Sequence, residues 1–241
     1  MNLRWLEKFF TRAAPREIVL SAAQRQAIDA WQQLPAAASH ASHYQSRYVV
    51  ADVETSGLDM QKDSLISIGA VAVVNGQIDF HDVFEVVLRQ DEVSTNANIL
   101  LHGIGGSAQR EGVAPPDALI AFLRYLGKAP LVAYHALFDQ TMIERAMQDF
   151  LGVKFGQQWI DLAWVMPELF REHIAEQVGL DDWMAIFGIE NILRHNAVSD
   201  AYATAKLLQT AIARGVLRGA PSPDSFVDIE KARRWRRAEL A

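Results

Sequence analysis

The chain has 241 residues, of which 50% are hydrophobic, so it can bury a full core and global disorder is excluded. It contains no cysteine, which excludes disulfides and thiolate metal sites, so any bound metal must take oxygen or imidazole ligands. The formal net charge of −6 argues against a protein that passively coats nucleic acid, because such proteins usually carry excess positive charge.

Three zones follow one another along the chain. Residues 1–45 are predicted to form a helical N-terminal extension, because their apolar side chains recur at helical spacing. Residues 46–218 are predicted to form the main domain, and residues 219–241 a basic C-terminal tail. The N-terminus has no signal-peptide core, and no apolar run approaches the roughly 20 residues of a membrane span. We therefore expect a soluble, cytoplasmic protein that does not contact a membrane.

The main domain opens with three predicted strands. Residues 48–53 form a short apolar run, and residues 65–74 form a longer one. Asn75-Gly76 follows at once and is a strong signal for a hairpin turn into a third strand over residues 80–88. This pattern predicts a meander of three neighbouring strands.

Helices and short strands alternate in the rest of the main domain. Apolar side chains recur at helical spacing in residues 115–126, 137–150 and 199–214. Gly215 is predicted to end the last of these helices, and short strands are predicted at residues 131–134 and near 159–160. We therefore expect an α/β fold in which helices flank a mixed sheet, which is consistent with a ribonuclease-H-like sheet.

Two acidic residues end the first predicted strand. Asp52 and Glu54 are two positions apart, so their side chains point to the same face of an extended chain. One interpretation is a partly exposed strand end with two solvated acids. The other is a pair of ligands for a hard divalent cation, because Mg²⁺ and Mn²⁺ prefer carboxylate oxygens.

Further candidate residues lie at the starts of later helices. Asp139 falls in the first turn of one helix and Asp200 in that of another, which His195 precedes. Each residue alone is explained more simply by capping or by the helix dipole. Together they favour a site, because strand ends and the helix starts that follow them cluster at one edge of an α/β sheet. Four carboxylates gathered there would repel one another unless cations held them, and two divalent ions with a nearby base can cleave a phosphodiester.

Three motifs in order carry a family resemblance. Residues 52–58 (DVETSGL) resemble the first motif, D-x-E-T-T-G-L, of the DnaQ-like (DEDDh) 3′-to-5′ exonuclease family. Residues 134–139 (YHALFD) look like its second motif, and residues 195–201 (HNAVSDA) look like the third, H-x-A-x-x-D-A. The resemblance covers residues 46–215 and extends to the exonuclease domain of the DNA polymerase III epsilon subunit.

The resemblance implies the residues of the active site. Four carboxylates would be both catalytic and metal-binding, and would hold two divalent cations, Mg²⁺ or Mn²⁺: Asp52, Glu54, Asp139 and Asp200. His195 would be the general base, and the product would be a nucleoside 5′-monophosphate. Three residues would bind the substrate: Thr55, Leu58 and His102. The segment around His102 (LHGI, residues 101–104) is explained equally well by a simple turn.

Two sets of residues have simpler interpretations. Asp161 matches a position that is commonly acidic in the family, but it is also placed to cap the following helix. Trp159, Trp164 and Trp183 fit apolar faces, so we expect them in the core rather than in contact with bases.

Three functions stay open from the sequence. The favoured one is an exonuclease in DNA repair or editing, acting on the 3′ end of single-stranded DNA. The second is a nuclease with the same site that trims RNA or degrades short oligonucleotides. The third is a non-catalytic interaction module, with residues 1–45 as the segment that docks a protein partner. The intact set of four acids and one histidine counts against the third, because a binding module has no need of it.

Overall fold

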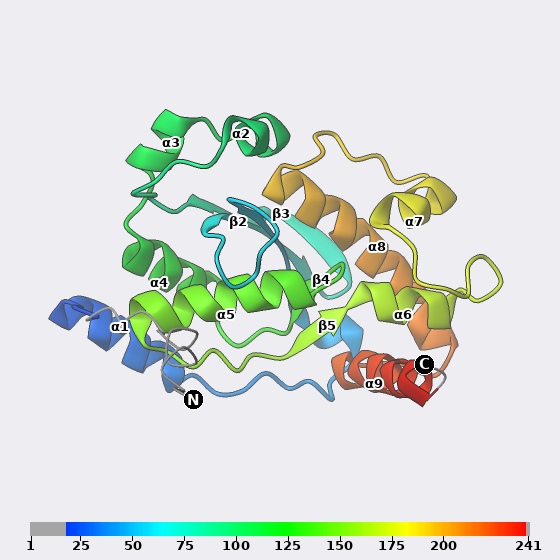
Figure 1. The fold of residues 1–241 in the computed structure, drawn as a ribbon. Coiled ribbons are helices and arrows are strands. Elements are labelled where there is room, and N and C mark those ends of the chain that lie inside the picture. Colours follow the sequence, from blue (N-terminus) through cyan, green and yellow to red (C-terminus); the bar gives the residue numbers. More distant parts are fainter. Residues whose placement is uncertain (1–17, 240–241) are drawn as a thin grey trace, which may run out of the picture.

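The computed structural model describes residues 18–239, and a five-stranded mixed sheet forms its centre (Figure 1). The strands are β1 (Arg47–Thr55), β2 (Leu65–Val74), β3 (Gln77–Val87), β4 (Leu131–Ala133) and β5 (Trp159–Asp161). Their order in the sheet is β3-β2-β1-β4-β5. β1, β2 and β3 pair antiparallel, whereas β4 and β5 run parallel to β1. This arrangement confirms the predicted α/β fold with a ribonuclease-H-like sheet.

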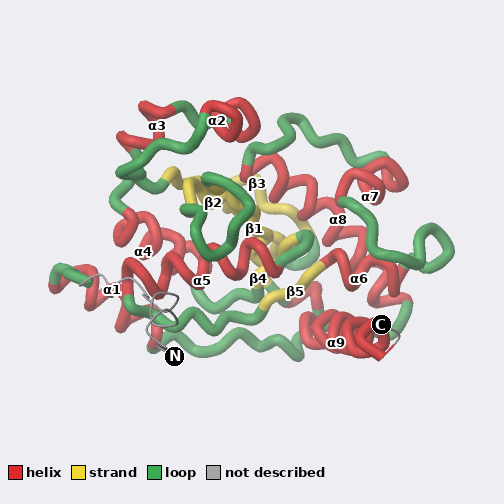
Figure 2. The backbone as a smooth tube through the Cα atoms, viewed as in Figure 1, coloured by secondary structure: helices red, strands yellow, loops and turns green. Residues whose placement is uncertain are grey.

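Helices cover both faces of this sheet (Figure 2). They are α1 (Ala22–Gln32), α2 (Asn96–His102), α3 (Gly106–Glu111), α4 (Pro115–Leu126), α5 (Leu137–Leu151), α6 (Leu162–Leu169), α7 (Leu180–Phe187), α8 (Ala197–Leu217) and α9 (Pro223–Glu239), with a short 3₁₀ turn, η2 (His43–Gln45). Helices α4 and α5 pack on one face, and α6 and α8 pack on the other. No helix within residues 18–239 combines the length and the apolar character that crossing a membrane requires.

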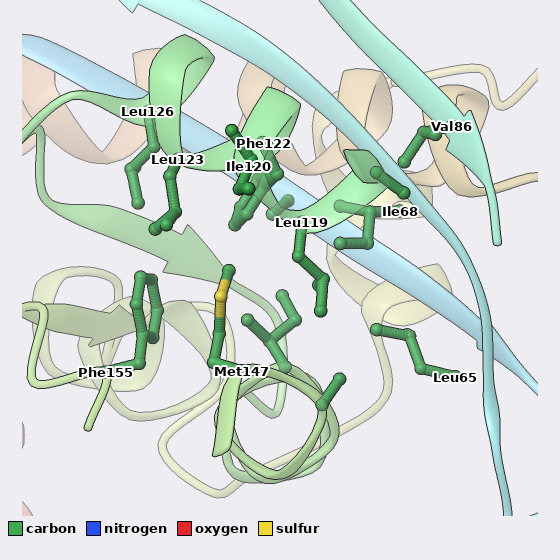
Figure 3. Packing of buried hydrophobic residues seen from close by; sticks show 14 of the residues in the cluster. Leu65, Ile68, Val86, Leu119, Ile120, Phe122, Leu123, Leu126, Met147 and Phe155 are labelled. Carbon is green, nitrogen blue, oxygen red and sulfur yellow. The ribbon is translucent and has the colours of Figure 1, made fainter. Parts of the chain in front are cut away.

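Side chains of β1 alternate between two hydrophobic cores. Val49, Ala51 and Val53 belong to the core with α4 and α5, which Figure 3 shows from close by. Tyr48 and Val50 belong to the other core, with α6 and α8. Because successive side chains of a strand point to opposite faces, the even-numbered row continues toward α8 at positions 52 and 54.

The hairpin between β2 and β3 has the conformation that its sequence predicts. Asn75 and Gly76 both have positive φ angles, 54° and 77°. Two successive residues with positive φ fit the type I′ turn, whose twist matches that of the flanking strands. The prediction of a hairpin at this point is confirmed.

The predicted end of the last long helix at Gly215 is wrong. Helix α8 continues to Leu217, and Gly215 lies inside it. A Cβ atom at this position would come within 2.6 Å of the ring of Phe226. Glycine is therefore present because α9 packs closely against α8 here, and not because the helix stops.

The two ends of the described chain pack on the main sheet's helices. Helix α1 buries Ile28 and Trp31 beside α4, and the predicted basic tail forms helix α9, which buries Phe226 and packs beside α6 and β5. The helical spacing within residues 1–17 lies outside the described residues. The zone boundaries after residues 45 and 218 stay predictions.

Candidate active site

Three acidic side chains converge beside the end of β1. Oxygen atoms of Asp52, Glu54 and Asp200 lie within 4.8 Å of one another. Asp52 and Glu54 project from the same face of β1, as the strand period predicts, and Asp200 comes from the first turn of α8. This is the juxtaposition that the sequence led us to expect for these three residues.

A glycine in β2 allows α8 to approach the sheet this closely. Gly69 pairs with Asp52 across the ladder, and a Cβ atom at position 69 would lie 2.4 Å from the backbone of Ala197 and Val198. The start of α8 thus rests on the backbone of β2, and Asn196 caps it by accepting a hydrogen bond from Ser199 N at 3.0 Å. The sequence analysis missed Gly69; an isolated glycine inside a buried strand is the signal of close backbone approach.

Asp139 approaches from the opposite side of β1. Strand β4 ends at Ala133, and the carboxylate of Asp139, in the first turn of α5, accepts a hydrogen bond from Val53 N at 3.1 Å. It therefore takes the place of a strand partner that β4 is too short to supply. Only one carboxylate oxygen makes this bond. Asp139 is not part of the group of three, but its negative charge raises the pKa of Asp52.

Burial and nearby negative charge raise the pKa values of Asp52, Glu54 and Asp139. Burial, followed by repulsion from the other three acids, holds the pKa of Asp52 well above its usual range. Burial and repulsion from Asp200 and Asp139 raise the pKa of Glu54 to about 8, and burial raises that of Asp139 to about 7. A crowded set of oxygen donors that resists holding negative charge is the environment that a hard divalent cation relieves. The residues present therefore fit such a cation.

An arginine beside the site offsets part of this negative charge. Arg194 donates to Asp200 at 2.6 Å and forms an ion pair with Asp181 of α7 at 3.2 Å. Its charge lowers the pKa of Asp52 and of Glu54 against the stronger effects that raise them. The sequence analysis did not single out Arg194, since an arginine in a loop is usually solvated.

His195 lies in the loop immediately before α8. It is exposed and has a positive φ of 59°, which is uncommon for a residue with a side chain. Its backbone N–H donates to Asp200 at 2.9 Å, so the loop is fixed to one of the converging acids. The structure thus places His195 beside the acidic cluster, and its role as a base stays a prediction.

Thr55 is the last residue of β1, and Leu58 lies in the loop that follows. The hydroxyl of Thr55 donates to the carbonyl of Gly57 at 2.6 Å, and Asp63 accepts from Ser56 Oγ at 2.9 Å, which closes the loop. Leu58 is 85% exposed. The loop thus presents an apolar side chain to solvent four positions after Glu54, and its role in binding substrate stays a prediction.

His102, the third predicted substrate-binding residue, is turned inward. It is buried, with Nε2 3.3 Å from Ser94 Oγ and Nδ1 accepting from Ile104 N at 3.0 Å. Gly103 follows in the left-handed conformation and ends α2. Both ring nitrogens are used inside the protein, so these contacts favour the interpretation of this segment as a turn.

The simpler interpretations agree with the structure for Asp161, Trp159 and Trp183, but not for Trp164. Asp161 caps α6 by accepting from Ala163 N at 3.0 Å, as the simpler interpretation predicts. Trp183 is fully buried and Trp159 packs on the first core. The prediction for Trp164 is wrong: it is half-buried, because it sits at the edge of the α6–α9 contact where arginine side chains cover its ring.

Comparison with known proteins gives a family and a fold. The exonuclease model RNase_T matches residues 49–208. The chain is 27% identical over 160 residues to the PolC-type DNA polymerase III of Thermotoga maritima, and 29% identical over 187 residues to that of Bacillus subtilis. The matches cover 66% and 74% of this chain but only 11% and 12% of those proteins, so the chain spans about one ninth of the relatives' length.

Solved structures of nucleases share the fold. Escherichia coli exonuclease I in complex with a dT13 oligonucleotide aligns with a TM-score of 0.57 and 19% identity, over 71% of this chain and 42% of the other. Exonuclease X in complex with 5′ overhanging duplex DNA aligns with a TM-score of 0.58 and 18% identity, over 76% and 99% of the two chains. The cell-death related nuclease 4 aligns with a TM-score of 0.60 and 15% identity, over 73% and 67%.

Proposed function

Because the chain belongs to the RNase_T exonuclease family, we propose that it hydrolyses phosphodiesters from the 3′ end of a nucleic-acid strand, preferably single-stranded DNA. The family is the one that the three sequence motifs predicted. The observation that carries the proposal is the convergence of Asp52, Glu54 and Asp200, within 4.8 Å, at the motif positions where such an enzyme needs its acids.

We propose two divalent cations, Mg²⁺ or Mn²⁺, as cofactors. Asp52, Glu54 and Asp200 would hold one of them, and Asp52 with the remaining oxygen of Asp139 would hold the other. When bound, the cations would lower the pKa of the attacking water and stabilise the charge that develops on the phosphate and the departing 3′ oxygen.

Protein side chains would supply the remaining chemistry. Neutral His195 would accept a proton from the attacking water at a ring nitrogen, and its exposed position beside Asp200 supports this role. Leu58 would pack against the terminal nucleotide, and the backbone at Thr55 would position it. The bond between Thr55 and Gly57 supports this role, because it fixes the loop before substrate arrives.

DNA is favoured over RNA by the named relatives. The PolC-type proteins are DNA polymerases by name, and two of the solved neighbours are described with DNA bound. RNA trimming remains the second candidate substrate class for the same site, because both substrates offer the same phosphodiester. A cytoplasmic location and a protein partner at residues 1–45 stay predictions.

A polarity assay tests the proposal. Single-stranded DNA, duplex DNA and RNA of one sequence, each labelled at the 5′ end, are incubated with Mg²⁺ and sampled over time. We expect a ladder that shortens one nucleotide at a time from the 3′ end, fastest for single-stranded DNA, with nucleoside 5′-monophosphates as products. Immediate release of a labelled mononucleotide would show the opposite polarity, and mid-strand cuts alone would show an endonuclease.

A further inference from the structure

A cationic pocket lies between α6 and α9, and its arginines come from α9, beyond residue 208, where the segment that the exonuclease family model matches ends. It has a volume of about 520 Å³. It is lined by Trp164 of α6, by the loop residues 175–177 and by three arginines of α9: Arg233, Arg236 and Arg237. The net charge of −6 is therefore unevenly distributed, with five lysine or arginine residues between positions 231 and 237.

Positive charge exceeds negative charge inside this pocket. Glu168 of α6 forms ion pairs with three arginines: Arg171, Arg233 and Arg236. Arg237 adds a fourth positive charge, and Glu176, which also lines the pocket, adds a second negative one, so four guanidinium groups face two carboxylates. The Arg236 side chain is 47% exposed and retains donors for a further partner. Such crowding of like charges favours an anion in the pocket.

The pocket also offers an aromatic ring beside these charges. The guanidinium groups of Arg234 and Arg237 lie over the ring of Trp164, at 4.6 Å and 5.6 Å from its centroid. Arginines that bind phosphates together with an aromatic side chain on which a base can stack are typical of single-strand binding grooves. An acidic peptide would use the arginines but gains little from the ring.

One arginine of α9 reaches the carboxyl end of the sheet, where the carboxylates also lie. Arg234 pairs with Asp161 at the carboxyl end of β5, at 3.2 Å. β5 is two strands from β1 in the sheet, which corresponds to about 10 Å at the usual strand spacing. Figure 1 shows α6 and α9 side by side next to β5.

A second set of contacts connects this edge to the pocket. Tyr134, which follows β4, donates its hydroxyl to the carbonyl of Val178 at 2.5 Å. The neighbouring Gln177 accepts a hydrogen bond from Arg237. These two hydrogen bonds link the end of β4, beside β1, to Arg237 of α9 through residues 177–178.

We propose that this pocket binds the phosphodiester backbone of the same single strand whose 3′ end lies at the carboxylates, several nucleotides upstream of that end. The arginines contact phosphates, and a base stacks on Trp164 where an arginine that covers the ring turns to a phosphate instead. The inference rests on the proposed function, because it takes the strand's 3′ end to lie at the acids. It makes the protein bind long strands more tightly than short ones.

Binding without hydrolysis tests this inference. Anisotropy of labelled oligothymidylates of about 15 and about 4 nucleotides is measured in chelator over a range of salt concentrations. The double variant Arg236→Gln/Arg237→Gln is compared with the wild type and with Arg25→Gln/Arg124→Gln. The control pair removes the same charge from exposed positions on α1 and α4. It therefore corrects for the general effect of net charge.

We expect an effect that depends on the length of the DNA strand and on which arginines are replaced. Arg236→Gln/Arg237→Gln weakens binding of the longer strand about 10-fold relative to the control pair, and leaves the shorter strand unchanged. For this variant, the slope of the logarithm of affinity against the logarithm of salt concentration becomes shallower by about 1.4. Each lost phosphate contact on a single strand removes about 0.7 from that slope.

Three outcomes would overturn the inference. They are equal affinity and slope in the two double variants, no binding of the longer strand by the wild type, and displacement of that strand by polyglutamate of equal charge, which would indicate an acidic peptide ligand. Failure of the proposed function would be seen separately, as an absence of hydrolysis by the wild type in Mg²⁺.

Discussion

At the scale of single residues, His195 and Asp200 lie side by side, but replacing each should impair a different property of the enzyme, turnover for His195 and metal binding for Asp200. His195→Ala is expected to lower turnover about 100- to 10,000-fold, the usual contribution of a general base, while Mn²⁺ affinity changes little. Asp200→Asn is expected to weaken Mn²⁺ binding, because Asp200 is one of the three converging acids. Steady-state kinetics and calorimetric titration with Mn²⁺ separate the two effects.

The dependence of turnover on pH in His195→Ala provides a second test of the role of His195 as a base. A general base must be unprotonated to accept a proton, so turnover of the wild type should rise with pH, and this rise should weaken in the variant. If His195→Ala kept wild-type turnover and the same profile, His195 would be only a residue that flanks a helix.

The convergence of Asp52, Glu54 and Asp200 was predictable, because the three residues lie in short motifs whose places in strand and helix the sequence indicates. Asp52 and Glu54 follow from the strand period, and Asp200 from its place in a first helical turn. Arg194 was not predictable, because its partner Asp181 is 13 positions away and only the fold brings them together. The inward turn of His102 also depends on a distant group, the hydroxyl of Ser94.

At the scale of elements, the contact of α8 with β2 decides whether the acids meet. Gly69→Ala is expected to push the start of α8 off the sheet, since the added Cβ would lie 2.4 Å from its backbone. Overpacking of this kind typically costs about 1–3 kcal/mol. We expect a lower melting temperature and a loss of Mn²⁺ affinity, measured by differential scanning calorimetry and calorimetric titration.

A matched glycine provides the control for this substitution. A Cβ atom at Gly156 would meet no described atom within 4 Å, and its φ is not in the left-handed region. Gly156→Ala should therefore leave stability and metal affinity nearly unchanged. Wild-type metal affinity in Gly69→Ala would mean that α8 reaches the site without this close approach.

Long periodic elements were predictable, whereas elements held by distant partners were not. The helix predicted over residues 115–126 coincides with α4, and the strand over 65–74 with β2. Helix α9 was read as a tail, because its sequence is strongly charged and lacks an apolar stripe. It is held by Phe226 and by ion pairs to Glu168, which only the folded chain brings near.

At the scale of the whole molecule, a buried histidine joins the segment before β1 to the segment before α9. His43 is fully buried, accepts a hydrogen bond from the hydroxyl of Tyr48 through Nδ1 and donates to the carbonyl of Ala220 through Nε2 at 3.0 Å. In the neutral ring these two bonds use both nitrogens. Burial lowers the pKa of His43, and the bond to Ala220 opposes this in part.

Protonation of His43 should therefore destabilise the fold. Because its pKa is lower in the folded state, its contribution is fully present above the unfolded pKa of about 6.5 and is lost as pH falls below that value. His43→Gln has no such titration. The free energy of unfolding of the wild type, minus that of the variant, should shrink by up to about 1.4 kcal/mol per pH unit below about 6.5.

Chemical denaturation of both proteins across pH 5 to 8 measures this difference. Subtracting the variant removes the titration of the active-site acids, which both proteins share. A difference that stays constant with pH would mean that His43 is protonated equally in the folded and unfolded chain.

The central claim is that the acids at the end of β1 act through bound divalent cations. The most direct measurement is release of labelled nucleotide from a single-stranded DNA labelled at its 3′ end, first in excess chelator and then after Mg²⁺ or Mn²⁺ is restored, with Asp52→Asn in parallel. We predict no release in chelator, recovery with either ion, and no recovery in Asp52→Asn. Full release in excess chelator, or an Asp52→Asn variant as active as the wild type, would contradict the account.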